Sequence, residues 1–154
     1  MDKKLIMLCL VVLIGCGNDS NQENDSGNNF GYGFHFDVQG STGLKVRWEN
    51  TSGLGLSTLE DIYIGIMSCA GATVTGPLLI FQPDIQERFG HVGVYFYNTN
   101  TVAIDSDQPL NSTGQEVLRH EYTHHVLKLS GADFNQNENH GHVAFTNCSS
   151  LQHL

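Results

Sequence analysis

Basic side chains are scarce in this 154-residue chain, which has 7 Lys and Arg against 16 Asp and Glu and a formal net charge of −9. A chain this acidic is a poor partner for nucleic acid and for anionic lipid surfaces, because both repel negative charge. The sequence also lacks internal repeats and any apolar stretch long enough to span a bilayer. Its hydrophobic content of 40% is ordinary for a globular protein, and its length leaves room for one folded domain.

The N-terminal segment is typical of an export signal. Lys3 and Lys4 precede an apolar run over 5–14 that fits the hydrophobic region of a signal peptide. The run ends in Leu-Ile-Gly-Cys, which resembles the bacterial lipobox, and this resemblance implies that Cys16 becomes the lipidated first residue. Gly17 follows that cysteine in place of Asp, so the resemblance favours the outer membrane of a Gram-negative cell envelope. An ordinary secretory signal with a coincidental cysteine is the alternative.

The sequence divides into three parts. Residues 1–15 form the expected lipoprotein signal peptide, 16–29 the lipidated cysteine and its tether, and 30–154 the folded domain. After Cys16 the tether contains only Gly, Asn, Asp, Ser, Gln and Glu, so it cannot bury apolar surface and we expect it to be flexible. The lipid would then be the only attachment to the membrane.

Cysteine is scarce as well, with four residues in the chain. Cys9 would leave with the signal peptide and Cys16 would carry the lipid, which leaves Cys69 and Cys148. Neither lies in a C-x-x-C pair, so neither is expected to bind zinc or to belong to a redox-active pair. In an oxidising envelope compartment the economical expectation is one disulfide between them, with two free buried thiols as the alternative.

Periodicity over 30–154 predicts an α+β domain with a small mixed sheet packed on helices and no regular βαβ repeat. Apolar alternation and short apolar runs predict strands over 30–38, 44–49, 78–81, 92–97 and 102–105. The first two strands would pair as a hairpin. Two capping-box signals, Ser57 with Glu60 and Thr113 with Glu116, predict the starts of helices over about 58–69 and 113–130. Residues 132–154 are too irregular for an assignment.

The second predicted helix carries the most specific pattern in the chain. His120 and Glu121 begin an H-E-x-x-H sequence that ends at His124. On an α-helix residues i and i+4 share a face, so both imidazoles can bind one ion while the glutamate reaches a water on that ion. The pattern indicates a catalytic zinc site, and an exposed helix with two histidines by chance is the alternative. Apolar residues on two faces predict that this helix is buried on more than one side.

A catalytic zinc site needs a third protein ligand besides the two histidines. The downstream segment offers His140 and His142, followed by Phe145 and Cys148. With these residues the chain resembles the zincin metallopeptidases, in particular small bacterial lipoprotein zincins in which H-E-x-x-H precedes a Gly-containing turn, a His, an aromatic residue and a Cys. The resemblance covers about 63–148.

The resemblance implies a minimal zincin-like domain that binds Zn²⁺ through His120, His124 and one downstream histidine. His140 is favoured as that third ligand, and His142 remains the alternative. The pattern departs from the metzincins, because Leu127 stands where their extension of the motif has Gly. It departs from the gluzincins as well, because the only later glutamate, Glu138, lies in a predicted loop.

The activity implied by the resemblance is hydrolysis of peptide bonds by a metal-activated water, with Glu121 as general base. It also implies that an extended peptide substrate pairs with the free edge of the strand around 93–97, where Tyr95 and Tyr97 are possible oxyanion donors, although packing is the favoured role for both. His125 is expected to be a core or second-shell residue. The other three histidines have no predicted role; they are His35, His91 and His153. The competing hypothesis is a non-catalytic zinc-binding or structural envelope lipoprotein.

Overall fold

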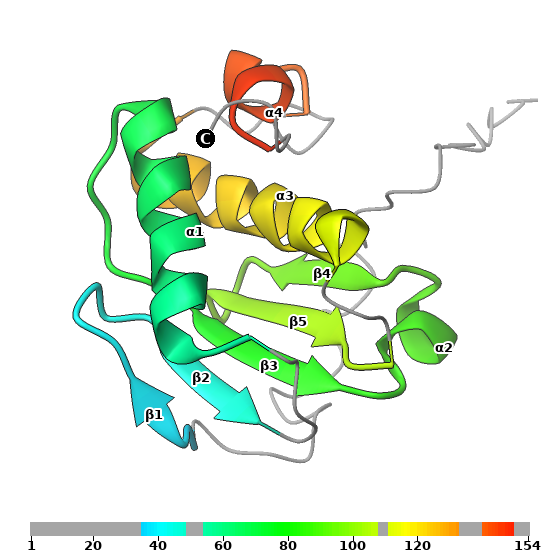
Figure 1. Ribbon diagram of the computed structural model, residues 1–154. Helices are drawn as coiled ribbons and strands as arrows, with labels where there is room; N and C mark the ends of the chain where they lie inside the picture. The colour runs from blue at the N-terminus through cyan, green and yellow to red at the C-terminus, as the bar shows by residue number, and fades with distance from the viewer. Residues whose placement is uncertain (1–34, 49–53, 108–110, 133–139, 150–154) are drawn as a thin grey trace, which may run out of the picture.

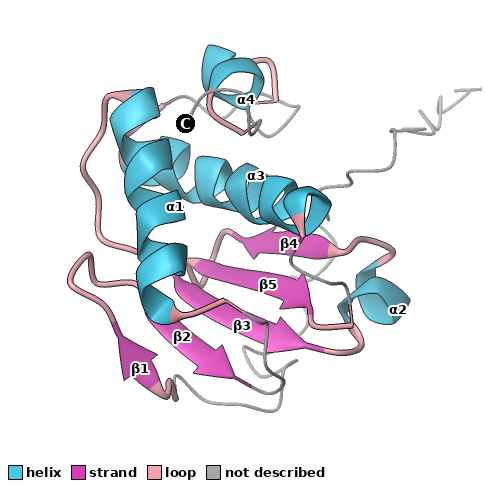
Figure 2. Cartoon of the chain, in the orientation of Figure 1, coloured by secondary structure: helices cyan, strands magenta, loops and turns pink. Residues whose placement is uncertain are grey.

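A five-stranded mixed sheet carries two long helices on one face, as Figure 1 shows. The computed structural model describes residues 35–48, 54–107, 111–132 and 140–149. The predicted signal peptide, Cys16 and the tether lie outside these residues. Helices and strands are interspersed along the chain without strict alternation (Figure 2), and the predicted α+β class with a mixed sheet is confirmed.

The strands follow the order β1-β2-β3-β5-β4 across the sheet. β1 (Val38–Gln39) and β2 (Lys45–Trp48) form the predicted hairpin, while β2 and β5 both run parallel to β3. The first strand was predicted over 30–38, but residues 35–37 are not part of a strand and 30–34 lie outside the described residues. β4 pairs antiparallel with β5 and lies at the end of the sheet. The last three strands are β3 (Leu78–Gln82), β4 (Gly93–Phe96) and β5 (Thr101–Asp105).

Helix α1 (Leu56–Ala70) connects β2 to β3, and because these strands are parallel the three elements form one βαβ unit. The predicted capping box at its start is wrong: the helix begins one residue before Ser57, and the cap is Gly55 with no side-chain hydrogen bond. Glu60 instead accepts hydrogen bonds from the β1–β2 turn, including one of 2.8 Å from the backbone N–H of Thr42. The glutamate therefore ties α1 to the hairpin.

Helix α3 (Ser112–Leu129) matches the predicted second helix within one residue at each end. Its start differs in chemistry from the prediction, because the cap is Asn111 and not Thr113. The Asn111 carboxamide oxygen accepts hydrogen bonds from the backbone N–H groups of Thr113 and Gly114, at 3.1 and 3.2 Å. An Asn at this position satisfies two of the donors that a helix start leaves free.

Two short helices were not predicted. α2 (Ile85–Phe89) packs its apolar side chains against residues of β4 and β5 that point away from α3. α4 (Val143–Asn147) lies over α1 and α3 on the side away from the sheet (Figure 1). Among the described residues, no helix is both long enough and apolar enough to cross a membrane.

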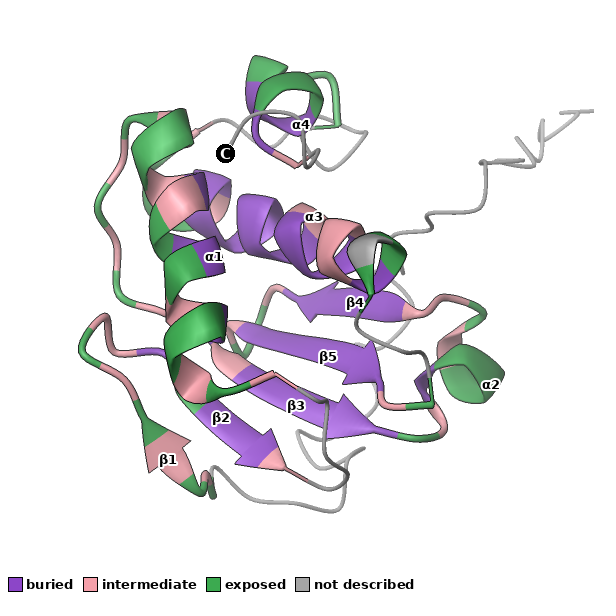
Figure 3. Ribbon diagram, in the orientation of Figure 1, coloured by how far each residue is buried: buried purple, intermediate pink, exposed green. Residues whose placement is uncertain are grey.

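The main core lies between the sheet and the two long helices. Every residue from Glu121 to Leu127 is buried, so α3 is enclosed on several sides as the sequence predicted (Figure 3). Tyr63 of α1 packs edge-on against Tyr122 of α3, with 5.1 Å between ring centroids. The fold therefore packs the turns of α3 that carry the H-E-x-x-H residues against the main core.

Candidate metal centre

Three histidines from two separate segments bring their ring nitrogens together. Nε2 of His140 lies 3.3 Å from Nε2 of His120 and 3.1 Å from Nε2 of His124. All three donor atoms lie within 4.8 Å of one another. Two nitrogens bound to one tetrahedral zinc at about 2.05 Å would be roughly 3.3 Å apart, which the two distances from His140 match. The three residues lie close enough to hold a metal ion.

Desolvation favours the neutral form of two imidazoles in this cluster, those of His120 and His140. Burial and the neighbouring His140 lower the pKa of His120 to about 4. Burial also lowers the pKa of His140. Metal ions bind neutral imidazole, so a lowered pKa leaves the nitrogen lone pairs available at neutral pH and below.

His142, the alternative third ligand, has a different task. Its Nδ1 accepts a 3.1 Å hydrogen bond from the backbone N–H of Ala144, so the side chain caps the start of α4. His140 precedes it by two residues and points to the other two histidines instead. Of the two candidates left open by the sequence, the structure brings His140 into the cluster.

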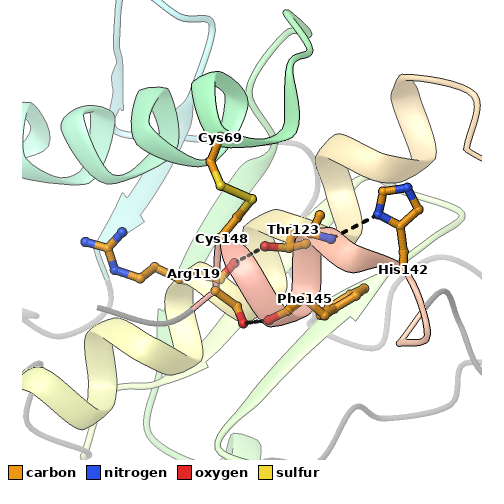
Figure 4. The surroundings of a disulfide bond; sticks show 8 residues. Cys69, Arg119, Thr123, His142, Phe145 and Cys148 are labelled. Atoms are coloured by element: carbon orange, nitrogen blue, oxygen red, sulfur yellow. Dashed lines mark hydrogen bonds between the residues drawn. A yellow bond between two sulfur atoms is a disulfide. The ribbon is translucent and has the colours of Figure 1, made fainter. Parts of the chain in front are cut away.

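Helix α4 holds the His140 segment in place. The ring of Phe145 packs against all three imidazoles, with centroid distances of 5.0 Å to His120, 4.6 Å to His124 and 4.9 Å to His140. Cys148, directly after α4, forms a disulfide with Cys69 in the last turn of α1, as Figure 4 shows. One covalent bond and one aromatic ring therefore fix α4 and its preceding turn against α1 and α3.

Glu121, the predicted general base, lies on the side of α3 that faces the start of β4. It is fully buried. A side chain at Gly93 would come within 2.5 Å of Val117 and 3.1 Å of the Glu121 carboxylate oxygen Oε1. Glycine at position 93 therefore permits β4 and α3 to approach closely beside this carboxylate. This contact was not predicted from the sequence.

The hydroxyl of Tyr97, the residue after β4, lies 2.9 Å from Nδ1 of His124, the ring nitrogen that faces away from the cluster. Tyr95 occupies a neighbouring but different position. Its ring is buried, and its hydroxyl lies 3.0 Å from Oδ1 of Asn100 and 3.1 Å from Nδ1 of His125. The rings of both tyrosines therefore pack against His124, and the hydroxyl of Tyr97 in addition reaches a ring nitrogen of that histidine.

His125 is a core residue, in agreement with the sequence analysis. Its Nε2 is 2.8 Å from the carbonyl oxygen of Thr75, which can only accept a hydrogen bond, so Nε2 carries the proton. Burial lowers the pKa of His125 to about 4 and keeps the ring neutral. His35 lies on the surface beside Asp37, and His91 also lies outside the cluster. His153 lies outside the described residues.

No known protein family, curated protein or solved structure matches this chain.

Proposed function

We propose that the protein is a zinc-dependent peptidase in which His120, His124 and His140 hold the ion and Glu121 is the general base. The observation that carries this proposal is the convergence of ring nitrogens from three histidines within 4.8 Å of one another. Two of these histidines belong to a helix that places a buried glutamate directly after the first. The pairing of H-E-x-x-H with a third histidine is what a catalytic zinc site requires.

The donor set fits zinc better than the harder divalent cations. Three neutral imidazoles suit zinc, whereas magnesium and calcium prefer oxygen ligands. Three protein ligands also leave a fourth position open, which distinguishes a catalytic site from a closed structural one. The buried H-E-x-x-H helix beneath α4 and beside an edge strand supports the further proposal that this is a minimal zincin-like domain.

A zinc ion bound here would lower the pKa of its water to about 7, and the ion would also polarise the carbonyl of the scissile peptide bond. Glu121 follows the first ligand on the same helix, so a fixed backbone connects the base to the site. Its carboxylate takes a proton from the attacking water and then passes it to the leaving amine. Burial beside Gly93 restricts the space available to that carboxylate.

The substrate class that fits this arrangement is an extended polypeptide. β4 is the last strand of the sheet, and no described strand pairs with its outer edge. Such an edge can bind an extended peptide through backbone hydrogen bonds. Because β4 begins at Gly93 beside Glu121 and ends just before Tyr97 beside His124, a peptide along it would run past the site.

We place this activity in the bacterial cell envelope, with Cys16 as a lipid anchor and the outer membrane as the favoured location. This part of the proposal depends on the lipobox resemblance alone, and metabolic labelling with a fatty acid would test it. Label that persists after Cys16→Ser would contradict it.

The test of the proposed activity is Glu121→Gln in the full-length protein as purified from cells. The neutral amide cannot accept the proton of the attacking water, so cleavage of unstructured polypeptides should fall roughly 10²- to 10⁴-fold. Zinc content, measured by elemental analysis, should stay the same because Glu121 is not a ligand. A chelator should also remove the activity of the wild-type protein.

Two outcomes would contradict the enzyme assignment. Cleavage by Glu121→Gln at the wild-type rate would mean that Glu121 is not the base. Zinc-loaded wild-type protein that cleaves nothing in a broad peptide library would favour the competing hypothesis of a non-catalytic zinc-binding lipoprotein.

A further inference from the structure

We infer that Tyr97 is a positioning residue for the metal centre: its hydroxyl oxygen accepts a hydrogen bond from Nδ1–H of His124 and so keeps Nε2 of that ring free of a proton and directed at the ion. The inference rests on the proposed metal centre and adds a residue that the H-E-x-x-H motif does not contain. Its basis is the 2.9 Å distance between the Tyr97 hydroxyl and Nδ1 of His124.

The two ring nitrogens of His124 have separate partners. Nε2 lies 3.1 Å from Nε2 of His140, inside the cluster, while Nδ1 lies against Tyr97 on the opposite side of the ring. A neutral imidazole carries its proton on one nitrogen only. For Nε2 to bind a metal, Nδ1 must carry that proton, and the oxygen of the Tyr97 hydroxyl is the atom placed to accept it.

Tyr97 is itself held from the same helix. The ammonium group of Lys128 donates a hydrogen bond to the backbone carbonyl of Tyr97 and another, of 2.9 Å, to Oδ1 of Asn100 in the β4–β5 turn. Lys128 follows His124 by one helical turn, so both side chains project from the same face of α3. The helix therefore holds the end of β4 at two points, through the Tyr97 hydroxyl and through its carbonyl.

This arrangement restricts the orientation of the His124 ring. The ring is almost fully buried, with 1% of its surface exposed, and Tyr97 packs edge-on to it at a centroid distance of 6.0 Å. A hydroxyl that accepts from Nδ1–H selects both the tautomer and the ring rotation. Loss of such a partner typically weakens metal binding about 10- to 100-fold, although the partner never touches the metal.

The chain offers a matched control in Tyr95. Tyr95 and Tyr97 lie on the same side of the strand path, and their rings are in edge-on contact at 4.7 Å. The Tyr95 hydroxyl, however, faces Asn100 and His125, neither of which belongs to the metal cluster. The ring of Tyr95 also stacks on His124, and a Phe at position 95 would keep that contact. Each substitution removes one hydroxyl, but only Tyr97→Phe removes a hydrogen bond to a proposed ligand.

The experiment compares Tyr97→Phe with Tyr95→Phe in the full-length protein. Zinc affinity is measured by competition with a chromophoric chelator. We expect Tyr97→Phe to weaken zinc binding about 10- to 100-fold and Tyr95→Phe to leave it within a few-fold of wild type. Thermal unfolding of the metal-free proteins shows whether each variant is folded.

A second readout requires neither zinc nor activity. Nitrogen-15 NMR of the metal-free wild-type protein should show His124 with its proton on Nδ1. In Tyr97→Phe this single tautomer should be lost, while Tyr95→Phe should retain it.

The inference is overturned if the metal-free wild type carries the His124 proton on Nε2, or if the two variants bind zinc equally well. These results would leave the metal centre intact. Failure of the wild-type protein to bind zinc would instead overturn the proposed function. Because the NMR measurement needs no zinc, it tests the hydrogen bond between Tyr97 and His124 separately from zinc binding.

Discussion

The metal centre combines two regions that are built in opposite ways. Helix α3 has 18 residues, is capped by Asn111, and is buried from Glu121 to Leu127. The segment 140–149 contains one helix of five residues. The first four residues of this segment, 140–143, are exposed, and His140 is one of them. Figure 3 shows the contrast between the buried α3 and the largely exposed α4. Of the three ligands, His124 is therefore buried in the core, His120 is partly buried and His140 is exposed at the surface.

Because the two regions differ, different contacts fix the positions of the helical ligands and of His140. His120 and His124 are positioned by the packing of α3 against α1 and the sheet, which would persist without metal. A helix of five residues is far too short to be stable alone, since isolated helices below about 12–15 residues are marginal in water. The position of His140 therefore depends on the Cys69–Cys148 bond and on the Phe145 ring that contacts the three imidazoles.

Replacing the ligands themselves should give the largest effect. We expect His120→Ala or His124→Ala to abolish zinc binding, because each removes one of the two donors fixed by the helix. His140→Ala should also abolish tight binding but should leave the i,i+4 pair and hence weak residual binding. Calorimetric zinc titration measures the difference, with His35→Ala as a control because this exposed residue lies beside Asp37 and outside the cluster.

Complete loss of zinc binding in all three variants would show that the two helical histidines alone do not bind zinc measurably without His140. Unchanged affinity in His140→Ala would mean that the third donor comes from elsewhere in the chain.

The disulfide should have the next largest effect, and mainly on the surface segment. Replacing Cys69 and Cys148 together by Ser should lower the free energy of unfolding by roughly 2–4 kcal/mol, as measured by urea denaturation. Zinc affinity should fall as well, because His140 loses its covalent link to α1, while α3 keeps its contacts. The His120 and His124 NMR signals should change less than the His140 signal.

A double variant that combines the two serines with His140→Ala provides the control. If the disulfide acts through His140, the serines should cause no further loss of zinc affinity in that background. Additional weakening there would show that the disulfide also supports the α3 ligands.

The contrast between the long helix α3 and the short segment 140–149 also explains which features could be predicted from the sequence. The spacing of His120 and His124 is a local property of one helix, so their convergence followed from the residues alone. The two long helices followed from apolar periodicity. Their first residues did not, because Gly55 and Asn111 cap them in place of the Ser57 and Thr113 signals. Several residues near a helix start can satisfy the same backbone donors, and tertiary contacts select among them.

One non-local contact, the Cys69–Cys148 disulfide, was predicted from the sequence, but the contacts between β4 and α3 were not. The hydrogen bond between Tyr97 and His124 joins positions 27 residues apart, and its existence depends on how β4 packs on α3. The choice between His140 and His142 depended on where a short irregular segment turns. Gly93 carried no signal at all, because only the close approach of Val117 and Glu121 reveals why a side chain is excluded there.

The smallest effect should come from His142, the histidine two residues from His140. His142→Ala removes the acceptor for the Ala144 N–H and should destabilise α4 by about 1 kcal/mol, as expected for a lost helix cap. Since about 1.4 kcal/mol corresponds to a tenfold change in affinity, zinc binding should weaken by less than about tenfold. His142→Asn is the matched variant, because Asn is a preferred cap and should restore the affinity. Zinc titration of both variants beside His140→Ala separates cap from ligand: a loss in His142→Ala as large as that in His140→Ala, without recovery in His142→Asn, would make His142 the third ligand.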